Sequence, residues 1–357
     1  RQRQMCIRDR AITMIQFKVE AAIINRHPEW NMQDRILLNK IDYDRGVCVI
    51  DGKEYAMKSC CFPTVSPADP CKLTPEEQAL IDKLTHSFTV NEKLHKHIRL
   101  MLTHGSLYTI INDNLLFHAS VPLNPDGSLK EVELYKGLKF SGRELMNRID
   151  RVVRSAFQND TESNYKNFAI DYFLYLWCGR DSVLFDKSKM ATFERYFLKD
   201  KETYKEEKGN YFKLRDDEKV CDNILDAYGV TGRMRHIING HVPVHVVSGE
   251  NPIKANGKLM VIDGGFSQAY HKETGIAGYT LVYHSRGFQL VQHDPFTSTE
   301  DAILRGSDIK STTQIVEMSV HRMLVADTDI GRELKRQVEE LEKLLYAYRR
   351  GFIKEKL

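Results

Sequence analysis

The spacing of apolar residues predicts three helices in the first third of the chain. Residues 11–26 are apolar at almost every turn, which is typical of a buried helix, and Pro28 ends the pattern. A second helix begins after Thr74, because Thr74 and Glu77 have the spacing of a capping box. A third helical pattern covers residues 91–103.

Alternating apolar and polar residues predict strands elsewhere. Three segments indicate a strand, a turn and a second strand, namely residues 45–57, 106–118 and 278–293. The short apolar runs "HIINGH" (236–241) and "KLMVIDGG" (258–265) indicate single strands followed by loops. Since strands and helices are mixed along the chain, the predicted fold class is α/β or α+β with a mixed sheet.

Two amphipathic helices complete the pattern. Ser141 and Glu144 have capping-box spacing ahead of a helical stretch that runs as far as Phe157. From Asp329 onward, apolar residues recur at steps of three and four. They are Ile330, Leu334, Val338, Leu341, Leu345 and Tyr348. This spacing predicts one long C-terminal helix with an apolar stripe.

These patterns divide the chain into four parts. Residues 1–10 carry four positive charges without apolar periodicity, and "MCIRDR" resembles translated sequencing-adapter read-through. We interpret them as a foreign segment, which would mean that the true N-terminal part is missing, with a disordered tail as the alternative. Residues 11–104 form a helical and hairpin region, residues 105–328 the main α/β region, and residues 329–357 the C-terminal helix.

Composition narrows the class of protein. The 357 residues are 42% hydrophobic and 28% charged, which is ordinary for a globular protein. A formal net charge of +3 does not indicate the concentrated basic surface that nucleic-acid binding requires. No apolar stretch approaches the roughly 20 residues of a membrane helix. The seven cysteines are scattered without zinc-site spacing, which indicates reduced thiols. We therefore expect a cytoplasmic enzyme that binds neither nucleic acid nor membranes.

Two histidines are candidate metal ligands. His118 and His241 each follow an apolar run directly, in "LLFHASVP" and "IINGHVPV". A strand end holds a side chain rigidly, and imidazole is a good ligand for zinc, iron and, together with carboxylates, manganese. The alternative is that each histidine is a structural hydrogen-bonding partner. His245, in a segment that contains proline, is interpreted as structural.

Three cations are candidate phosphate binders. Arg180 lies in "WCGRDS" after an aromatic run, Arg195 lies in "ATFERYF", and Lys254 is close in sequence to the His241 loop. A guanidinium fork suits a phosphate group. The alternative for each cation is a surface ion pair. Asp263, in "VIDGGFS", is interpreted as a turn residue and not as a metal ligand.

The chain closely resembles a known family of enzymes. The resemblance is carried by "NLLFHASVPLNPDGS", "YLWCGRDSVLF", "MATFERYF", "HIINGHVPV", "NPIKANGKLMVIDGGFS", "GIAGYTLVYHS" and "VADTDIG". It points to the class III, Firmicutes-type bacterial fructose-1,6-bisphosphatases, which look like a branch of the calcineurin-like metallophosphoesterases. The resemblance implies a sandwich of two mixed sheets flanked by helices, with a two-metal site at the strand ends.

The resemblance also implies roles for individual residues. His118 and His241 would be ligands of the same metal, with Ser120 standing where relatives have glycine. The metal would be Mn²⁺, with Mg²⁺ as the alternative, and the substrate a small sugar bisphosphate. The implied reaction is hydrolysis of the 1-phosphate of fructose 1,6-bisphosphate to fructose 6-phosphate, in gluconeogenesis. A homo-oligomer is compatible with this family.

Three sequence blocks that this family would use are missing. They are Asp-x-His-Gly, Gly-Asp-x-x-Asp-Arg-Gly and Gly-Asn-His-Asp/Glu, and "DYDRG" (42–46) is only superficially like the second. We therefore expect the C-terminal part of a longer enzyme, with its catalytic residues upstream, an incomplete two-metal site and no activity of its own. The alternatives are a metallophosphatase for phosphoproteins or dinucleoside polyphosphates, and a non-catalytic fragment.

Overall fold

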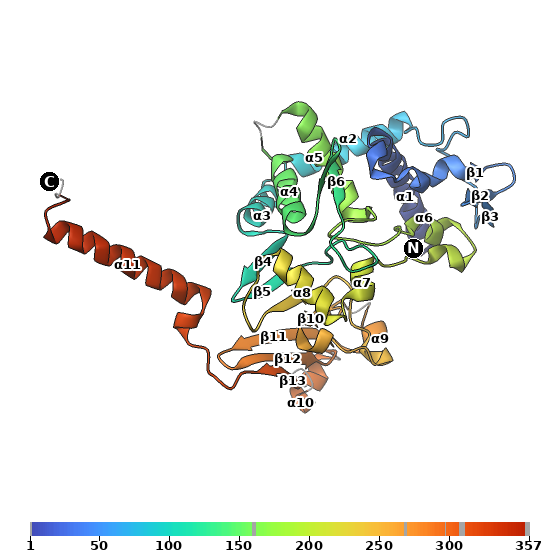
Figure 1. The fold of residues 1–357 in the computed structure, drawn as a ribbon. Coiled ribbons are helices and arrows are strands. Elements are labelled where there is room, and N and C mark those ends of the chain that lie inside the picture. The colour runs from blue at the N-terminus through green and yellow to red at the C-terminus, as the bar shows by residue number, and fades with distance from the viewer. Residues whose placement is uncertain (1, 159–161, 268–269, 297, 307–310, 354–357) are drawn as a thin grey trace. The chain divides into compact units, whose positions relative to one another are not determined.

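The computed structural model describes residues 2–158, 162–267, 270–296, 298–306 and 311–353 (Figure 1). The chain forms two compact units. The first comprises the residues up to 107 together with 118–214, and the second comprises 108–117 together with the residues from 215 onward. The first unit contains most of the helices and two small antiparallel sheets, whereas the second contains the larger sheets.

The first unit opens with helix α1 (Gln2–Arg26). Its end, just before Pro28, confirms the predicted stop, and the helix also includes residues 2–10. The expected hairpin around Asp51 is confirmed as β2 (Val47–Ile50) and β3 (Lys53–Ala56), with β1 (Ile41–Asp42) added beside β2. Asp51 and Gly52 both have positive φ, as a tight two-residue hairpin turn requires.

An apolar cluster joins these strands to later parts of the first unit. Its aromatic part is Phe17 of α1 packed edge-on against Phe193 and Phe197 of α6 (Thr192–Phe197). Its buried members are Met14, Leu37, Leu38, Ile41, Cys48, Ile50, Met57, Phe193, Phe197 and Leu198. Short 3₁₀ turns, η1 (Pro28–Trp30), η2 (Gln33–Arg35), η3 (Leu37–Lys40) and η4 (Lys201–Tyr204), link the elements.

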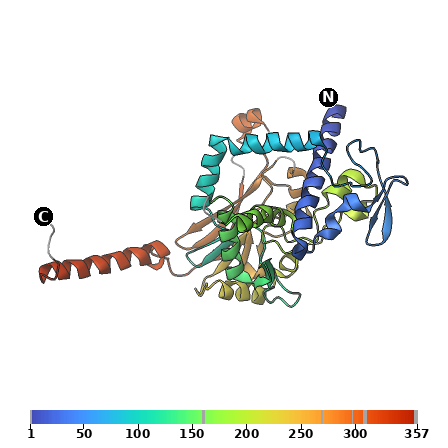
Figure 2. The ribbon, with the colours of Figure 1, turned by 90° about the horizontal axis from the view of Figure 1, so that it is seen from above.

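Helix α2 (Pro75–Thr89) begins with the predicted capping box. The Thr74 hydroxyl accepts from the Glu77 N–H at 3.2 Å, and the Glu77 carboxylate accepts from the Thr74 N–H at 2.8 Å. The same carboxylate lies 2.8 Å from the buried Nζ of Lys18, so the helix start is bound to α1. Helix α3 (Glu92–His104) follows with a sharp change of direction (Figure 2), and it ends at Gly105 as predicted.

The rest of the first unit differs in part from the sequence patterns. Helix α4 (Gly142–Ser155) is present, but the Ser141 side chain makes no capping hydrogen bond, so the predicted box is wrong. The Glu144 carboxylate instead accepts from Arg148 Nε at 2.6 Å. The sequence patterns did not indicate the antiparallel pair β6 (Val132–Tyr135) and β7 (Leu138–Phe140). Helices α5 (Ser163–Cys178) and α7 (Asn210–Leu214) complete the unit.

The second unit is built on a mixed five-stranded sheet. Its order is β4 (Tyr108–Ile111), β5 (Asn114–Phe117), β8 (His236–Asn239), β10 (Leu259–Val261) and β9 (Ile253–Lys254). Strands β5, β8 and β10 are parallel, and the two edge strands are antiparallel to their neighbours. Every residue of β8 and β10 is buried, as expected for parallel strands covered on both faces. Nearby lie α8 (Glu218–Ala227), η5 (Val246–Ser248) and η6 (Ala255–Gly257).

A second sheet packs on the first through three buried residues. Ile238 of β8, Met260 of β10 and Phe288 of β12 form this shared core. The predicted hairpin is confirmed as β11 (Gly278–His284) and β12 (Gly287–His293), and β13 (Ser311–Met318) extends it. This sheet is antiparallel, so the expectation of two mixed sheets holds for only one of them, while the α/β class itself is confirmed. Short helices α9 (His271–Thr274) and α10 (Thr299–Arg305) flank it.

Helix α11 (Asp329–Arg349) is the long C-terminal helix that the apolar stripe predicted, and η8 (Val325–Asp327) precedes it. The helix was expected to reach residue 357, but it ends at Arg349 and a turn follows. Residues 354–357 lie outside the described ranges. Within those ranges, no helix has the length and apolar character needed to cross a membrane.

Candidate functional site

The two candidate metal ligands follow neighbouring parallel strands. β5 pairs in parallel with β8, with Leu116 opposite Ile238. The chain leaves β5 at His118 and leaves β8 at Gly240 and His241. Because parallel strands end on the same side, β5 and β8 both end at the carboxyl edge of this sheet of the second unit, where α/β proteins commonly bind ligands. The pairing joins segments more than a hundred residues apart, which no local pattern in the sequence could reveal.

His241 has an unusual backbone conformation. Its φ of 66° lies in the left-handed region, and the Val242 N–H donates to the Gly240 carbonyl across it at 2.8 Å. Such a conformation costs about 1–3 kcal/mol in a residue other than glycine, and it is enriched at ligand sites. The loop is fixed on both sides, because the Asn239 carbonyl accepts from Ile262 N at 2.9 Å and Val244 N donates to the Asp263 carbonyl at 2.9 Å.

Asp263 is a turn residue, as the sequence indicated. Its carboxylate Oδ1 accepts a hydrogen bond from the Gly265 N–H, two residues later, at 2.9 Å. This contact closes a turn directly after β10. The side chain therefore has a local structural role that requires no metal.

The loop after His118 is anchored by a buried carboxylate. His118 itself is exposed, whereas Ser120 is fully buried. The Ser120 hydroxyl donates to Asp186 Oδ2 at 2.5 Å, and the Ser120 N–H donates to the Val183 carbonyl at 3.2 Å. Ser120, which replaces the glycine expected from the resemblance, thus has a specific partner in this chain.

Asp186 is a residue that the sequence patterns did not single out. It is 4% exposed, has a φ of 47°, and accepts the Gly209 N–H on its carbonyl at 2.8 Å. Burial raises the pKa of its carboxyl from 3.8 to about 6, although the hydrogen bond from Ser120 opposes that shift. A buried carboxyl with this pKa titrates near neutral pH, and no periodicity in the sequence indicates it.

The two candidate arginines in the first unit already have acidic partners. The guanidinium of Arg180 forms an ion pair with Asp34, and its Nε donates to the Ser188 carbonyl at 3.0 Å. Arg195 is 55% exposed and lies 3.7 Å from Glu206. Both arginines therefore form ion pairs, which was the alternative to phosphate binding. These contacts leave the proposed phosphate binding untested.

Lys254 belongs to the second unit and is also paired. Its Nζ lies 3.1 Å from Glu250, and its side chain is 11% exposed. Glu250 further accepts from Arg215 at 3.4 Å and from the backbone N–H of His245 at 3.0 Å. These hydrogen bonds outweigh the effect of burial and hold the pKa of Glu250 below its ordinary value. Lys254 is therefore part of a charged cluster that supports the loop after His241.

His118 and His241 together would supply part of a metal site. Two imidazoles have the right chemistry for a divalent transition metal, but they supply only two of the roughly four to six donors that such ions bind. Among the residues that the structure describes, no group of three or more His, Cys, Asp or Glu side chains is arranged to hold a metal.

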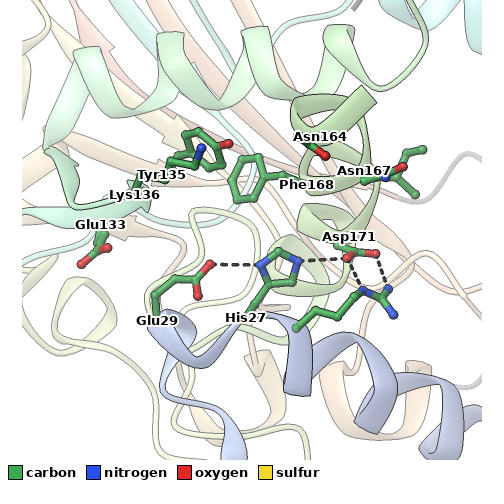
Figure 3. A pocket seen from close by; sticks show the side chains of 11 residues that line it. His27, Glu29, Glu133, Tyr135, Lys136, Asn164, Asn167, Phe168 and Asp171 are labelled. Carbon is green, nitrogen blue, oxygen red and sulfur yellow. Dashed lines mark hydrogen bonds and ion pairs between the residues drawn. The ribbon is translucent and has the colours of Figure 1, made fainter. Parts of the chain in front are cut away.

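A cavity of about 780 Å³ lies in the first unit, and its lining residues are others than the candidate metal ligands and phosphate binders (Figure 3). His27 stands between two carboxylates, with Nδ1 at 3.0 Å from Glu29 and Nε2 at 2.9 Å from Asp171. Arg26 donates to both oxygens of Asp171, at 2.9 and 2.7 Å. Phe168 and Tyr135 form an aromatic wall, with ring centroids 4.5 Å apart.

Around His27, the charged side chains of Arg26, Glu29 and Asp171 are paired with His27 or with one another. Burial alone would raise the pKa of Asp171, but the hydrogen bonds from Arg26 and His27 outweigh it and hold that pKa below its ordinary value. The sequence offered one signal, because Asp171 is the single acidic residue in the aromatic run "NFAIDYFLYLWC". An acidic residue inside such a run requires a buried partner.

The fold defines an α/β protein whose second unit packs a mixed sheet on an antiparallel one, with a histidine directly after β5 and another two residues after β8. The family model described as Firmicute fructose-1,6-bisphosphatase matches residues 1–350. Similar proteins named fructose-1,6-bisphosphatase class 3 occur in Phocaeicola vulgatus (60% identity), Parabacteroides distasonis (59%) and Clostridium novyi (52%). Each alignment covers 97% of this chain and 52% of the relative. The chain therefore belongs to the Firmicute fructose-1,6-bisphosphatase family.

The extent of these matches matters for the function. The chain spans about half the length of the curated relatives it matches. No solved structure matches it.

Proposed function

We propose that this chain is part of a class 3 fructose-1,6-bisphosphatase and contributes His118 and His241 to its divalent-metal site. The observation that carries the proposal is that the two strands directly preceding these histidines, β5 and β8, are parallel neighbours. The left-handed backbone of His241 supports it, because strain of this kind persists where a side chain must be aimed. The names of the relatives supply the substrate.

The proposed reaction is the hydrolysis of the 1-phosphate of fructose 1,6-bisphosphate to fructose 6-phosphate and phosphate, a step of gluconeogenesis in the cytoplasm. A bound metal would supply an activated hydroxide and a Lewis acid for the phosphoryl oxygens. His118 and His241 would each present a neutral imidazole nitrogen. Mn²⁺ is preferred over Mg²⁺ in this proposal, because Mg²⁺ favours oxygen ligands. The fold would be that of the calcineurin-like metallophosphoesterases.

Arg180, Arg195 and Lys254 remain the proposed phosphate-binding cations. Each would have to exchange a carboxylate for the phosphate group. Arg195 would do so at the lowest cost, because its carboxylate partner is 3.7 Å away and its side chain is half exposed.

We also propose that this chain alone hydrolyses no substrate. Its sequence contains none of the three metal-binding blocks that the resemblance leads us to expect. Two histidines do not complete a two-metal site, so the remaining ligands would come from the part of the relatives that this chain does not match.

The test compares phosphate release by the intact Phocaeicola vulgatus relative and by this chain, each with Mn²⁺. We expect the relative to act on fructose 1,6-bisphosphate in preference to a phosphoserine peptide, and this chain to act on neither. A preference for the phosphopeptide would favour a protein phosphatase instead. Manganese-dependent release of phosphate by this chain alone would refute the proposal that the metal site needs ligands from outside this chain.

A further inference from the structure

Helix α11 is drawn in red in Figure 1. It carries an apolar stripe whose side chains are exposed among the described residues. Gly331 is the only residue of the helix that is buried. Five apolar side chains of the stripe are 45–63% exposed. They are Leu334, Val338, Leu341, Leu345 and Tyr348. A helix of 21 residues with such a stripe gains most of its stability by packing the stripe against another element.

The spacing of the stripe matches a coiled-coil seam. From Leu334 to Tyr348 the steps are four, three, four and three residues, which is the heptad repeat and has an average period of 3.5. In heptad terms, Val338 and Leu345 occupy a positions, and Leu334, Leu341 and Tyr348 occupy d positions. Val338 at a, between Leu334 and Leu341 at d, fits the preference of a parallel two-stranded coil for β-branched residues at a and leucine at d, whereas Leu345 and Tyr348 do not add to it. The fitting partner is thus another helix with the same repeat.

The flanking charges favour a parallel arrangement of two identical helices. Lys335, Glu342 and Arg349 occupy e positions, while Gln337 and Leu344 occupy g positions. In a parallel pair, g faces e of the second copy, so Gln337 meets Glu342 and Leu344 meets Arg349 without like charges. In an antiparallel pair, e faces e, which would bring Lys335 against Arg349 and Glu342 against Glu342. Like charges across a seam are unfavourable.

The polar face and the N-terminus of α11 have partners within the chain. On the polar face, Arg336 forms ion pairs with Glu333 at 2.6 Å and with Glu340. At the N-terminus, Asn112 N donates to the Asp329 carboxylate at 2.6 Å, and Asp329 N donates to the Asn112 side chain at 2.9 Å. These contacts fix the start of the helix to the β4–β5 turn of the same unit. The apolar stripe has no such cover among the described residues.

We propose that α11 is the dimerisation element of this chain and forms a parallel two-stranded coiled coil with α11 of a second copy. The stripe is self-complementary, as a twofold interface between identical chains requires. In this coil Leu341 packs against its own equivalent, and Lys343, at an f position, faces solvent. This inference is independent of the proposed catalytic role.

Disulfide cross-linking of the full chain tests both the partner and its direction. We expect Leu341→Cys to give a covalent dimer on oxidation, because parallel d positions face each other. Lys343→Cys is the matched control and should not exceed the background from the native cysteines, measured with the unmodified chain. An antiparallel coil brings Leu341 opposite Leu345, so it would leave Leu341→Cys at background. That result would overturn the proposal, as would equal cross-linking at both positions.

Sedimentation equilibrium provides a second, independent readout. The unmodified chain should be dimeric, and Leu341→Lys should raise the dimer dissociation constant at least about 100-fold, because two buried leucines are lost per dimer. Lys343→Ala should leave the constant unchanged. A monomeric unmodified chain would show that the stripe serves another contact. A dimer that Leu341→Lys does not weaken would show that another surface holds the copies together. Either result overturns the proposal.

Discussion

The buried carboxyl of Asp186 makes the stability of the chain depend on pH in a defined direction. Its pKa is raised to about 6 in the folded state from an ordinary value of 3.8. A carboxyl with a raised pKa binds more protons when the chain is folded, so its contribution to stability is complete below the ordinary value. That contribution is lost as the pH rises through the folded value. The shift of about two units corresponds to about 3 kcal/mol, because each unit is worth about 1.36 kcal/mol.

The substitution Asp186→Asn isolates this effect. Asparagine has the same shape, tolerates the positive φ at this position and does not titrate. We expect the free energies of unfolding of the two chains to be similar at pH 4. By pH 7 the Asp186→Asn chain should be more stable than the unmodified chain by about 3 kcal/mol. Urea denaturation of both chains across this pH range measures the difference.

Ser120 provides the matched control. The Ser120 hydroxyl bonds to Asp186 Oδ2 at 2.5 Å and lowers the pKa of that carboxyl, so Ser120→Ala should raise the pKa further. When Asp186 and its Asn variant are compared in the Ser120→Ala background, the difference in their free energies of unfolding should therefore develop at a higher pH. A stability difference between Asp186 and its Asn variant that does not change between pH 4 and pH 7 would refute the reasoning.

Two further substitutions test other features of the fold. Glu77→Ala should lower the free energy of unfolding by about 3–5 kcal/mol, because it leaves the fully buried Lys18 ammonium without its carboxylate. The double variant Lys18→Met, Glu77→Leu should lose clearly less free energy of unfolding than Glu77→Ala. An equal loss in the two variants would contradict the interpretation that Lys18 and Glu77 form a buried ion pair. His241→Gly should raise stability by up to about 1 kcal/mol by relieving the left-handed backbone. His245→Gly, at a φ of −87°, should lower it instead, and the reverse order in thermal melts would argue against strain at His241.

Local signals in the sequence predicted many of the elements. The box formed by Thr74 and Glu77 starts α2 as expected, because both of its hydrogen bonds form. The same spacing failed at Ser141, where Glu144 bonds to Arg148 instead and Gly142 adopts a positive φ. A capping motif is thus only one use of these side chains, and neighbouring residues decide which use prevails.

Strand β13 and the cavity around His27 depend on long-range structure. The first five residues of β13 are all exposed, so the strand lacks the alternation by which a half-buried strand is recognised. His27 meets Asp171 across 144 positions of the chain, whereas the local sequence around Pro28 indicates only a helix end. Contacts of this kind are set by tertiary packing and leave no periodic trace.

The candidate ligands were found because each follows a strand directly. Their relationship through the parallel pairing of β5 with β8 became visible only in the structure. The anchoring of Ser120 by Asp186 was also unexpected, since the residues are 66 positions apart. The sequence therefore identified residues whose side chains could bind a metal, whereas the contacts that hold their loops in place are visible only in the fold.

The central claim is that His241 is a metal ligand and His245 is not. The direct test changes the histidine aligned with each position to alanine in the intact Phocaeicola vulgatus relative, and measures bound manganese together with phosphate release from fructose 1,6-bisphosphate. The change at the His241 position should lower activity by more than about 100-fold and reduce the bound metal, because loss of a ligand exceeds the effect of losing an outer hydrogen bond. The change at the His245 position should preserve both. Full activity and full metal content after the change at the His241 position would contradict the account.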